Sequence, residues 1–147
     1  MSKRLGLLVM MALLICASFA IVSAKEQQNS VTSNGGYIIV PSHVIGIKPL
    51  TVYNSITQGK TNWEAKTVSS YITTLNVDLY WGNPSNSLQL TIYSPDGNTF
   101  GPYYDSSDGS TDGRINLNIQ NSNGIAEGTW YYKVYGYSVT GTQSYSI

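Results

Sequence analysis

Three aspartates close together are the residues of this sequence whose type and spacing could do chemistry. Asp105, Asp108 and Asp112 lie within eight residues, beside glycines that let the backbone turn tightly. A hard cation such as Ca²⁺ takes about six to eight oxygen ligands, which an acidic loop supplies. The spacing makes these three carboxylates candidate metal ligands, and Asp96 joins them if the preceding loop folds back. The spacing does not match the EF-hand pattern and Asp-Gly pairs are common in turns, so ordinary solvated turns are the simpler interpretation.

Tyrosine supplies a second group of candidates, with 12 tyrosines and three tryptophans in 147 residues. Exposed aromatic rings can stack on sugar rings or form an adhesive patch, whereas cross-strand pairing that stabilises a sheet is the simpler explanation. The strand pattern places Trp63, Trp81, Trp130 and Tyr132 on buried faces. The candidate ligand surface, on the polar faces of the predicted strands, consists of Tyr80, Tyr93, Tyr131, Tyr135 and Tyr137.

Other chemistry has little support in the residues. His43 is the sole histidine and Cys16 the sole cysteine, so the sequence provides no multi-histidine metal site and no thiol nucleophile in the expected mature chain. No nucleophile and orienting group accompany His43, which we interpret as a loop histidine. No basic patch is present to neutralise phosphates, so we expect no nucleic-acid binding. We therefore expect no enzymatic activity.

The first 24 residues have the pattern of a signal peptide. Lys3 and Arg4 precede an uncharged run from Leu5 to Val22. Small residues up to Ala24 then form the expected cleavage site. The run is long enough that a retained membrane anchor is the alternative. Cleavage after Ala24 removes 24 of the 147 residues and leaves 123, with six basic and eight acidic side chains. The sequence thus predicts a secreted or cell-surface protein, with a flexible polar lead-in over residues 25–36 and one domain over 37–147.

The elements that must position the candidates are short strands. Apolar residues alternate strictly with polar residues at 75–81, 88–93, 115–120 and 130–135, which is typical of sheets with one buried face. Residues 37–40 form an apolar run stopped by Pro41, which indicates an edge strand. No mature segment has the 3.6-residue period of a helix. We predict an all-β fold, an antiparallel, jelly-roll-like β-sandwich of seven to nine strands.

Three motifs resemble the pre-peptidase C-terminal domain family. They are Ser55–Gly59 with Thr61–Trp63, then Leu75–Leu79 followed by Leu90–Gly97 (LTIYSPDG), then Gly128–Gly136 (GTWYYKVYG). The similarity extends over residues 51–147. The chain is also similar to secreted proteins of methanogenic archaea. The resemblance implies a non-catalytic β-sandwich of the kind appended to exported proteases, some of which bind calcium, collagen or polysaccharide. No protease domain is present here, and no calcium ligand of the family matches a position in this sequence.

Together these observations predict a secreted or cell-surface, non-catalytic module that binds a macromolecule or assists an exported partner enzyme. The alternative is a calcium-stabilised carbohydrate-binding module. We expect no required cofactor, with Ca²⁺ as the ion that the acidic loop could take. The expected partner is a protein or polysaccharide outside the cell, and a membrane is expected only if the N-terminal segment is retained.

Overall fold

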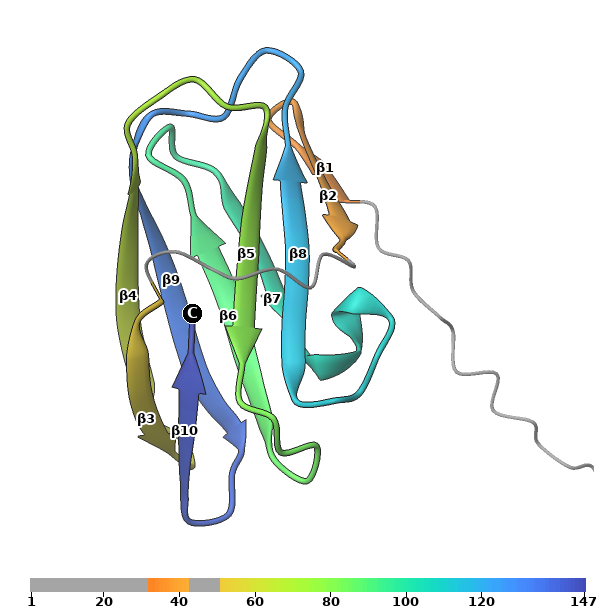
Figure 1. The fold of residues 1–147 in the computed structure, drawn as a ribbon, viewed down its shortest axis with the longest axis vertical. Helices are drawn as coiled ribbons and strands as arrows, with labels where there is room; N and C mark the ends of the chain where they lie inside the picture. The colour runs from red at the N-terminus through yellow and green to blue at the C-terminus, as the bar shows by residue number, and fades with distance from the viewer. Residues whose placement is uncertain (1–31, 43–50) are drawn as a thin grey trace, which may run out of the picture.

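The structure, a computed structural model, describes residues 32–42 and 51–147. The expected signal peptide, residues 25–31 of the expected lead-in and His43 lie outside the described residues. Ten strands and one short 3-10 helix make up the described chain (Figure 1). They are β1 (Thr32–Asn34), β2 (Tyr37–Pro41), β3 (Tyr53–Thr57), β4 (Thr61–Val68), β5 (Thr74–Tyr80), β6 (Ser87–Tyr93), β7 (Thr99–Tyr103), η1 (Asp105–Asp108), β8 (Arg114–Gln120), β9 (Gly128–Ser138) and β10 (Thr142–Ser146).

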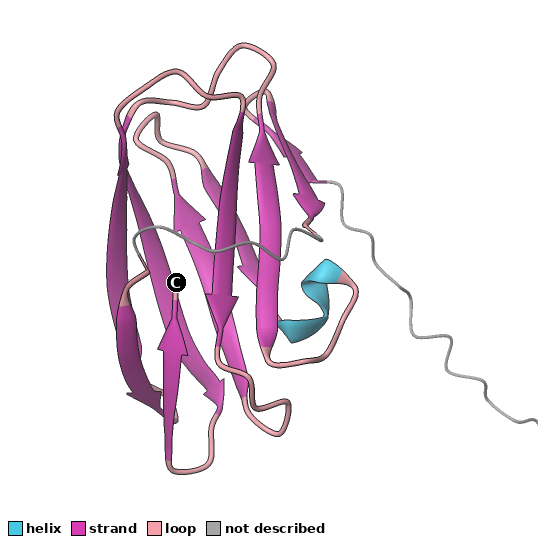
Figure 2. Ribbon diagram, in the orientation of Figure 1, coloured by secondary structure: helices cyan, strands magenta, loops and turns pink. Residues whose placement is uncertain are grey.

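Two antiparallel sheets pack face to face as a β-sandwich, which confirms the predicted fold class (Figure 2). The six-stranded sheet has the order β1-β2-β8-β5-β10-β3, and the four-stranded sheet has the order β4-β9-β6-β7. The number of strands is larger than the seven to nine expected. In the part of the chain that the structure describes, no helix is long and apolar enough to cross a membrane.

The core lies between the sheets and is formed by the apolar members of the alternating strands. Trp130 is fully buried and its ring stacks on that of Phe100, with 6.1 Å between the centroids. The edge of Tyr37 meets both rings, at 5.4 Å from Phe100 and 5.9 Å from Trp130. Leucine, isoleucine and valine side chains, with a few further aromatic rings, fill the rest. The inward positions of β5, β6, β8 and β9 are apolar, as the alternation in the sequence predicted.

The N-terminal hairpin differs from the prediction. β1 lies inside the stretch expected to be a flexible lead-in, so the fold begins before Tyr37. Because β1 pairs with one side of β2 and β8 with the other, β2 is not the edge strand that Pro41 indicated. Gly35 and Gly36 connect the two strands with φ of 58° and 83°, a conformation that favours glycine.

Candidate functional site

Asp105 closes the acidic loop by binding backbone amides. It begins η1, directly after β7, and its carboxylate is buried. The Asp105 Oδ1 atom accepts hydrogen bonds from the backbone N–H groups of Asp112 (3.2 Å), Gly113 (3.0 Å) and Arg114 (3.1 Å). A Cβ at Gly113 would lie 2.7 Å from the backbone N of Asn83, so only glycine fits where this loop meets the β5–β6 connection. The carboxylate therefore anchors the return of the chain into β8.

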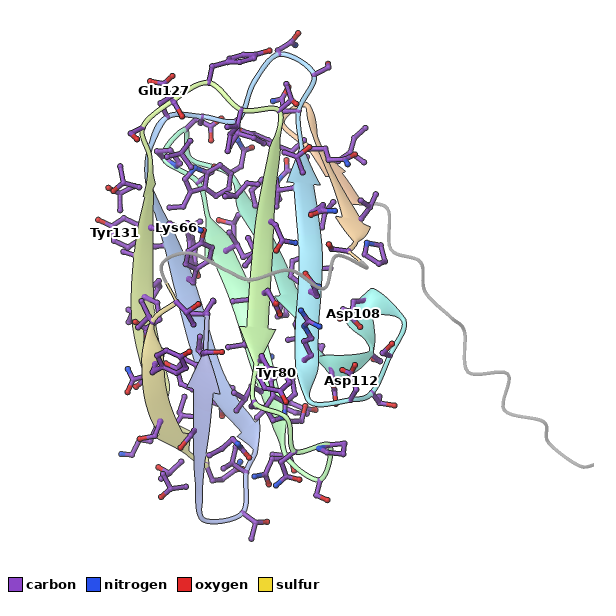
Figure 3. All side chains as sticks on the ribbon, in the orientation of Figure 1. Lys66, Tyr80, Asp108, Asp112, Glu127 and Tyr131 are labelled. Carbon is purple, nitrogen blue, oxygen red and sulfur yellow. The ribbon has the colours of Figure 1, made fainter. Side chains whose placement is uncertain are left out.

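Asp108 performs the same role one turn later. Its Oδ1 atom accepts the N–H of Ser110 at 3.1 Å, and its Oδ2 atom accepts the N–H of Asn116 on β8 at 2.8 Å. Asp112, in contrast, is exposed to solvent. Figure 3 shows Asp108 and Asp112 on the loop beside the lower end of β8. Two of the three predicted ligands thus direct carboxylate oxygens at backbone donors.

Asp96 does not join this loop, and the expectation that it could is wrong. It lies in the turn before β7, whereas η1 follows β7, so the length of that strand separates the two (Figure 1). Its carboxylate accepts hydrogen bonds from the hydroxyls of Tyr37, at 2.7 Å, and Ser94. Within the described residues, no group of three or more His, Cys, Asp or Glu side chains is placed to hold a metal ion.

The pKa values of these carboxyls follow their surroundings. Burial raises the pKa of Asp105 and of Asp108 above the ordinary 3.8, and the backbone donors offset this only in part. Burial also acts to raise the pKa of Asp96, but hydrogen bonds from Ser94, Tyr37 and Asn98 prevail and lower it. Folding therefore disfavours the charged form of Asp105 and of Asp108.

A second surface, the outer face of the four-stranded sheet, carries most of the candidate tyrosines. Because side chains alternate along a strand, Tyr131, Tyr135 and Tyr137 of β9 project from the same face. Tyr93 of β6 lies directly opposite Tyr131 in the antiparallel pairing. Tyr131 and Tyr137 are each 50% exposed. Four of the five predicted ligand-surface tyrosines thus share one face, which we call the aromatic face.

Trp63 also lies on the aromatic face, and the expectation that it is buried is wrong. It is 57% exposed, and its ring centroid lies 5.4 Å from that of Tyr93, across β9. The alternate residue Glu64 points inward instead. Its carboxylate accepts hydrogen bonds from the Tyr145 hydroxyl at 2.7 Å and the Asn54 amide at 2.9 Å. Because β4 is an edge strand, these polar partners can reach the inward carboxylate from the other sheet.

The predicted core positions of the other large aromatic residues are confirmed. Trp81, Trp130 and Tyr132 are 5%, 0% and 4% exposed. Tyr80, however, does not lie with the other candidate tyrosines. It belongs to β5 of the six-stranded sheet and is 52% exposed, so it faces solvent on a different side of the molecule (Figure 3).

Polar groups are interspersed with the rings on the aromatic face. At one end, Tyr104 packs edge-on against Tyr137 with 5.0 Å between the ring centroids, and its hydroxyl accepts a hydrogen bond from the Gln89 amide at 2.8 Å. Lys133 of β9 lies between Trp63 and Thr91 in the strand pairing. Sequence reasoning missed Trp63, Tyr104 and Lys133. The alternation of β9 itself places Lys133 beside Tyr131 and Tyr135, so that signal was present.

Comparison with known proteins identifies one relative and no described activity. No protein-family model matches the chain. A protein of Archaeoglobus fulgidus, described as uncharacterized, is 55% identical over 53 residues, which cover 36% of this chain and 71% of that protein. The chain belongs to the same family as this archaeal protein. A function for the chain must therefore be argued from the geometry of its surfaces.

Proposed function

We propose that this chain is a non-catalytic β-sandwich module, secreted or displayed at the cell surface, that binds a macromolecule or assists an exported partner enzyme. The observation that carries the proposal is the aromatic face. Trp63, Tyr131 and Tyr137 each leave half or more of their surface in water, and all three lie on one sheet. Large exposed aromatic groups gathered on one surface mark interaction sites.

The shape of the face favours a long, extended ligand. Tyr131 and Tyr137 are six residues apart on β9, which corresponds to about 20 Å along an extended strand. The face belongs to a sheet, so its rings line a surface rather than a cavity. Such a surface suits a polymer that lies along it, whether polysaccharide or extended polypeptide.

The resemblance to pre-peptidase C-terminal domains supports the same proposal. The segments that carry it lie in β3 and β4 with the turn between them, in β5, in β6 with its following turn, and in β9. Export of the chain, with cleavage after Ala24, is part of the proposal. N-terminal sequencing of the protein recovered from outside the producing cell should then begin at Lys25.

Removal of single rings from the aromatic face tests the proposed site. The mature chain would be applied to a glycan array, to insoluble cellulose and chitin, and to collagen. Trp63→Ala and Tyr131→Ala should each weaken binding to the retained ligand at least about tenfold, as loss of an interface aromatic does. Tyr53→Ala is the control, because Tyr53 is 82% exposed on the other sheet. Absence of binding throughout, or binding that survives both face variants, would refute the proposal.

Fluorescence adds an independent reading of the same site. Trp63 is 57% exposed, whereas Trp81 and Trp130 are buried, so iodide should quench Trp63 preferentially. A ligand that covers the aromatic face should protect Trp63 from iodide. A ligand that binds without protecting it lies elsewhere on the molecule.

A calcium-stabilised carbohydrate-binding module is the second candidate. The hydroxyl, amide and aromatic groups mixed on the aromatic face favour carbohydrate as the ligand. The calcium part fits less well, because Asp105 and Asp108 already direct their oxygens at backbone N–H groups. We therefore propose that the module requires no cofactor. Calcium titration followed by melting measurements tests this part separately.

A further inference from the structure

We propose that the aromatic face binds an acidic polysaccharide, with Lys133 as the residue that recognises the carboxylate of a uronic acid. This inference rests on the proposed function and specifies its ligand. It starts from the distribution of charge over the described part of the chain. That distribution is uneven between the two sheets.

One basic side chain, that of Lys133, lies on the aromatic face. Four basic residues fall within residues 32–42 and 51–147. Lys133 lies on the face itself, and Lys60 is exposed in the turn that enters β4. Lys66 of β4 is exposed too, but it alternates with Trp63 and so projects from the other side of the strand. The fourth, Arg114, is committed to the six-stranded sheet, where its guanidinium binds the Asp78 carboxylate with N–O distances of 2.6 and 2.8 Å.

Acidic side chains are absent from this face among the described residues. Glu64 of β4 points inward and is bound by Tyr145, and Asp96 is bound in the β6–β7 turn. The remaining described carboxylates lie on β5, around η1 or in the loop before β9. Figure 3 shows Glu127 of that loop near one end of the sandwich, away from Tyr131. No ion pair of Lys133 with a described carboxylate is present. Its charge is therefore available to a ligand.

The position of Lys133 suits a sugar that carries a carboxylate. Residues directly opposite in an antiparallel pair have Cβ atoms about 5 Å apart, so Lys133 and Trp63 are immediate neighbours. A sugar ring stacked on Trp63 or Tyr93 would bring its substituents within reach of the flexible Lys133 ammonium. Gln89, Thr91 and Thr129 offer neutral donors and acceptors for hydroxyl groups on either side.

Nucleic acid fits the same surface less well. A nucleic acid carries one negative charge at every phosphate, and its affinity depends on many cationic contacts. Lys133 on a face of about 20 Å, with Lys60 in the turn before β4, supplies too few cationic contacts for that charge density. A uronate polymer spaces its charges with neutral hydroxyls, which matches the mixed polar and aromatic character of the face.

Paired polysaccharides test the inference. The mature chain would be titrated with polygalacturonate, alginate and hyaluronate, each beside its carboxyl-reduced form, by affinity electrophoresis and calorimetry. We expect at least one acidic polymer to bind about tenfold or more tightly than its reduced form, as the loss of a charged hydrogen bond implies. Lys133→Gln should remove this preference and Lys133→Arg should retain it. Binding should weaken as the salt concentration rises from about 0.05 to 0.5 M.

The outcomes separate this inference from the proposed function. Equal binding of acidic and reduced polymers that is abolished by Trp63→Ala would overturn the charge recognition and leave the macromolecule-binding proposal standing. Binding to no polymer, or tighter binding to a single-stranded oligonucleotide or to anionic lipid vesicles, would overturn the acidic-polysaccharide inference. Binding that is indifferent to both Lys133→Gln and Trp63→Ala would refute the aromatic face as the site.

Discussion

Replacement of Asp105 by alanine should strongly destabilise the fold although Asp105 has no proposed contact with a ligand. Its Oδ1 atom accepts three backbone N–H groups, those of Asp112, Gly113 and Arg114. Truncation leaves all three donors without this acceptor. Each donor left without an acceptor lowers the free energy of unfolding by about 1–3 kcal/mol when water cannot replace the lost partner.

The magnitude follows from how buried each bond is. The bond from Gly113 is buried, whereas those from Asp112 and Arg114 are partly buried, so water can reach the latter two donors. We therefore expect a loss of about 3 kcal/mol in the free energy of unfolding, dominated by the Gly113 donor. For a domain of this size the melting temperature should fall by about 10 °C.

The matched control is Asp112→Ala in the same loop. Because Asp112 is exposed, its truncation should change the free energy of unfolding by no more than about 0.5 kcal/mol. Urea unfolding followed by circular dichroism measures both variants. An equal loss in the two variants, or a melting temperature of Asp105→Ala within about 2 °C of the unaltered protein, would refute the assignment of Asp105 as the loop anchor.

Four further predictions concern buried hydroxyls, the pH dependence of two carboxyls and the acidic loop. The buried Tyr103 hydroxyl has no partner among the described residues, so Tyr103→Phe should preserve the free energy of unfolding or raise it by about 1 kcal/mol. Tyr145→Phe should lower it by about 1–3 kcal/mol, because the Glu64 carboxylate loses a donor. Thermal melts of the two variants test both expectations. Folding raises the pKa of Asp108, so its contribution to stability falls as pH rises from 3.8 through the raised pKa. Asp108→Asn removes this loss, so between pH 4 and pH 7 the free energy of unfolding of the variant should fall less, or rise more, than that of the unaltered protein. Urea unfolding at a series of pH values measures this, and the same pH dependence in both proteins would contradict it. The effect of Asp96 on stability has the opposite dependence on pH. Its pKa is lowered by folding, so it contributes stability above pH 3.8 that is lost as pH falls through the folded pKa. Asp96→Asn should abolish this contribution in the same assay. Millimolar CaCl₂ should leave the melting temperature unchanged beside a MgCl₂ control, and a rise specific to calcium would restore the calcium-stabilised alternative.

Alternation in the sequence was sufficient where a strand had two neighbours and its apolar residues lay on one face. β5, β6, β8 and β9 each have bonded strands on both sides, and their apolar residues all face the core. The same reasoning failed on β4, where the strand pattern placed Trp63 on the buried face. At this sheet edge, an inward Glu64 could be satisfied by Tyr145 and Asn54, so Trp63 was free to face solvent.

The sequence by itself determined the fold class, because period-two alternation admits only a sheet with one buried face. It also determined that Asp105, Asp108 and Asp112 lie in one loop and that β9 carries tyrosines on one side. The tertiary structure decided what those residues do. It turned the Asp105 and Asp108 carboxylates onto backbone amides, separated Asp96 from them by the length of β7, and placed Tyr80 on the opposite sheet. These outcomes depend on which strands become neighbours in a sheet. Neighbours such as β4 and β9 are far apart in the sequence, so the local pattern of residues does not specify their pairing.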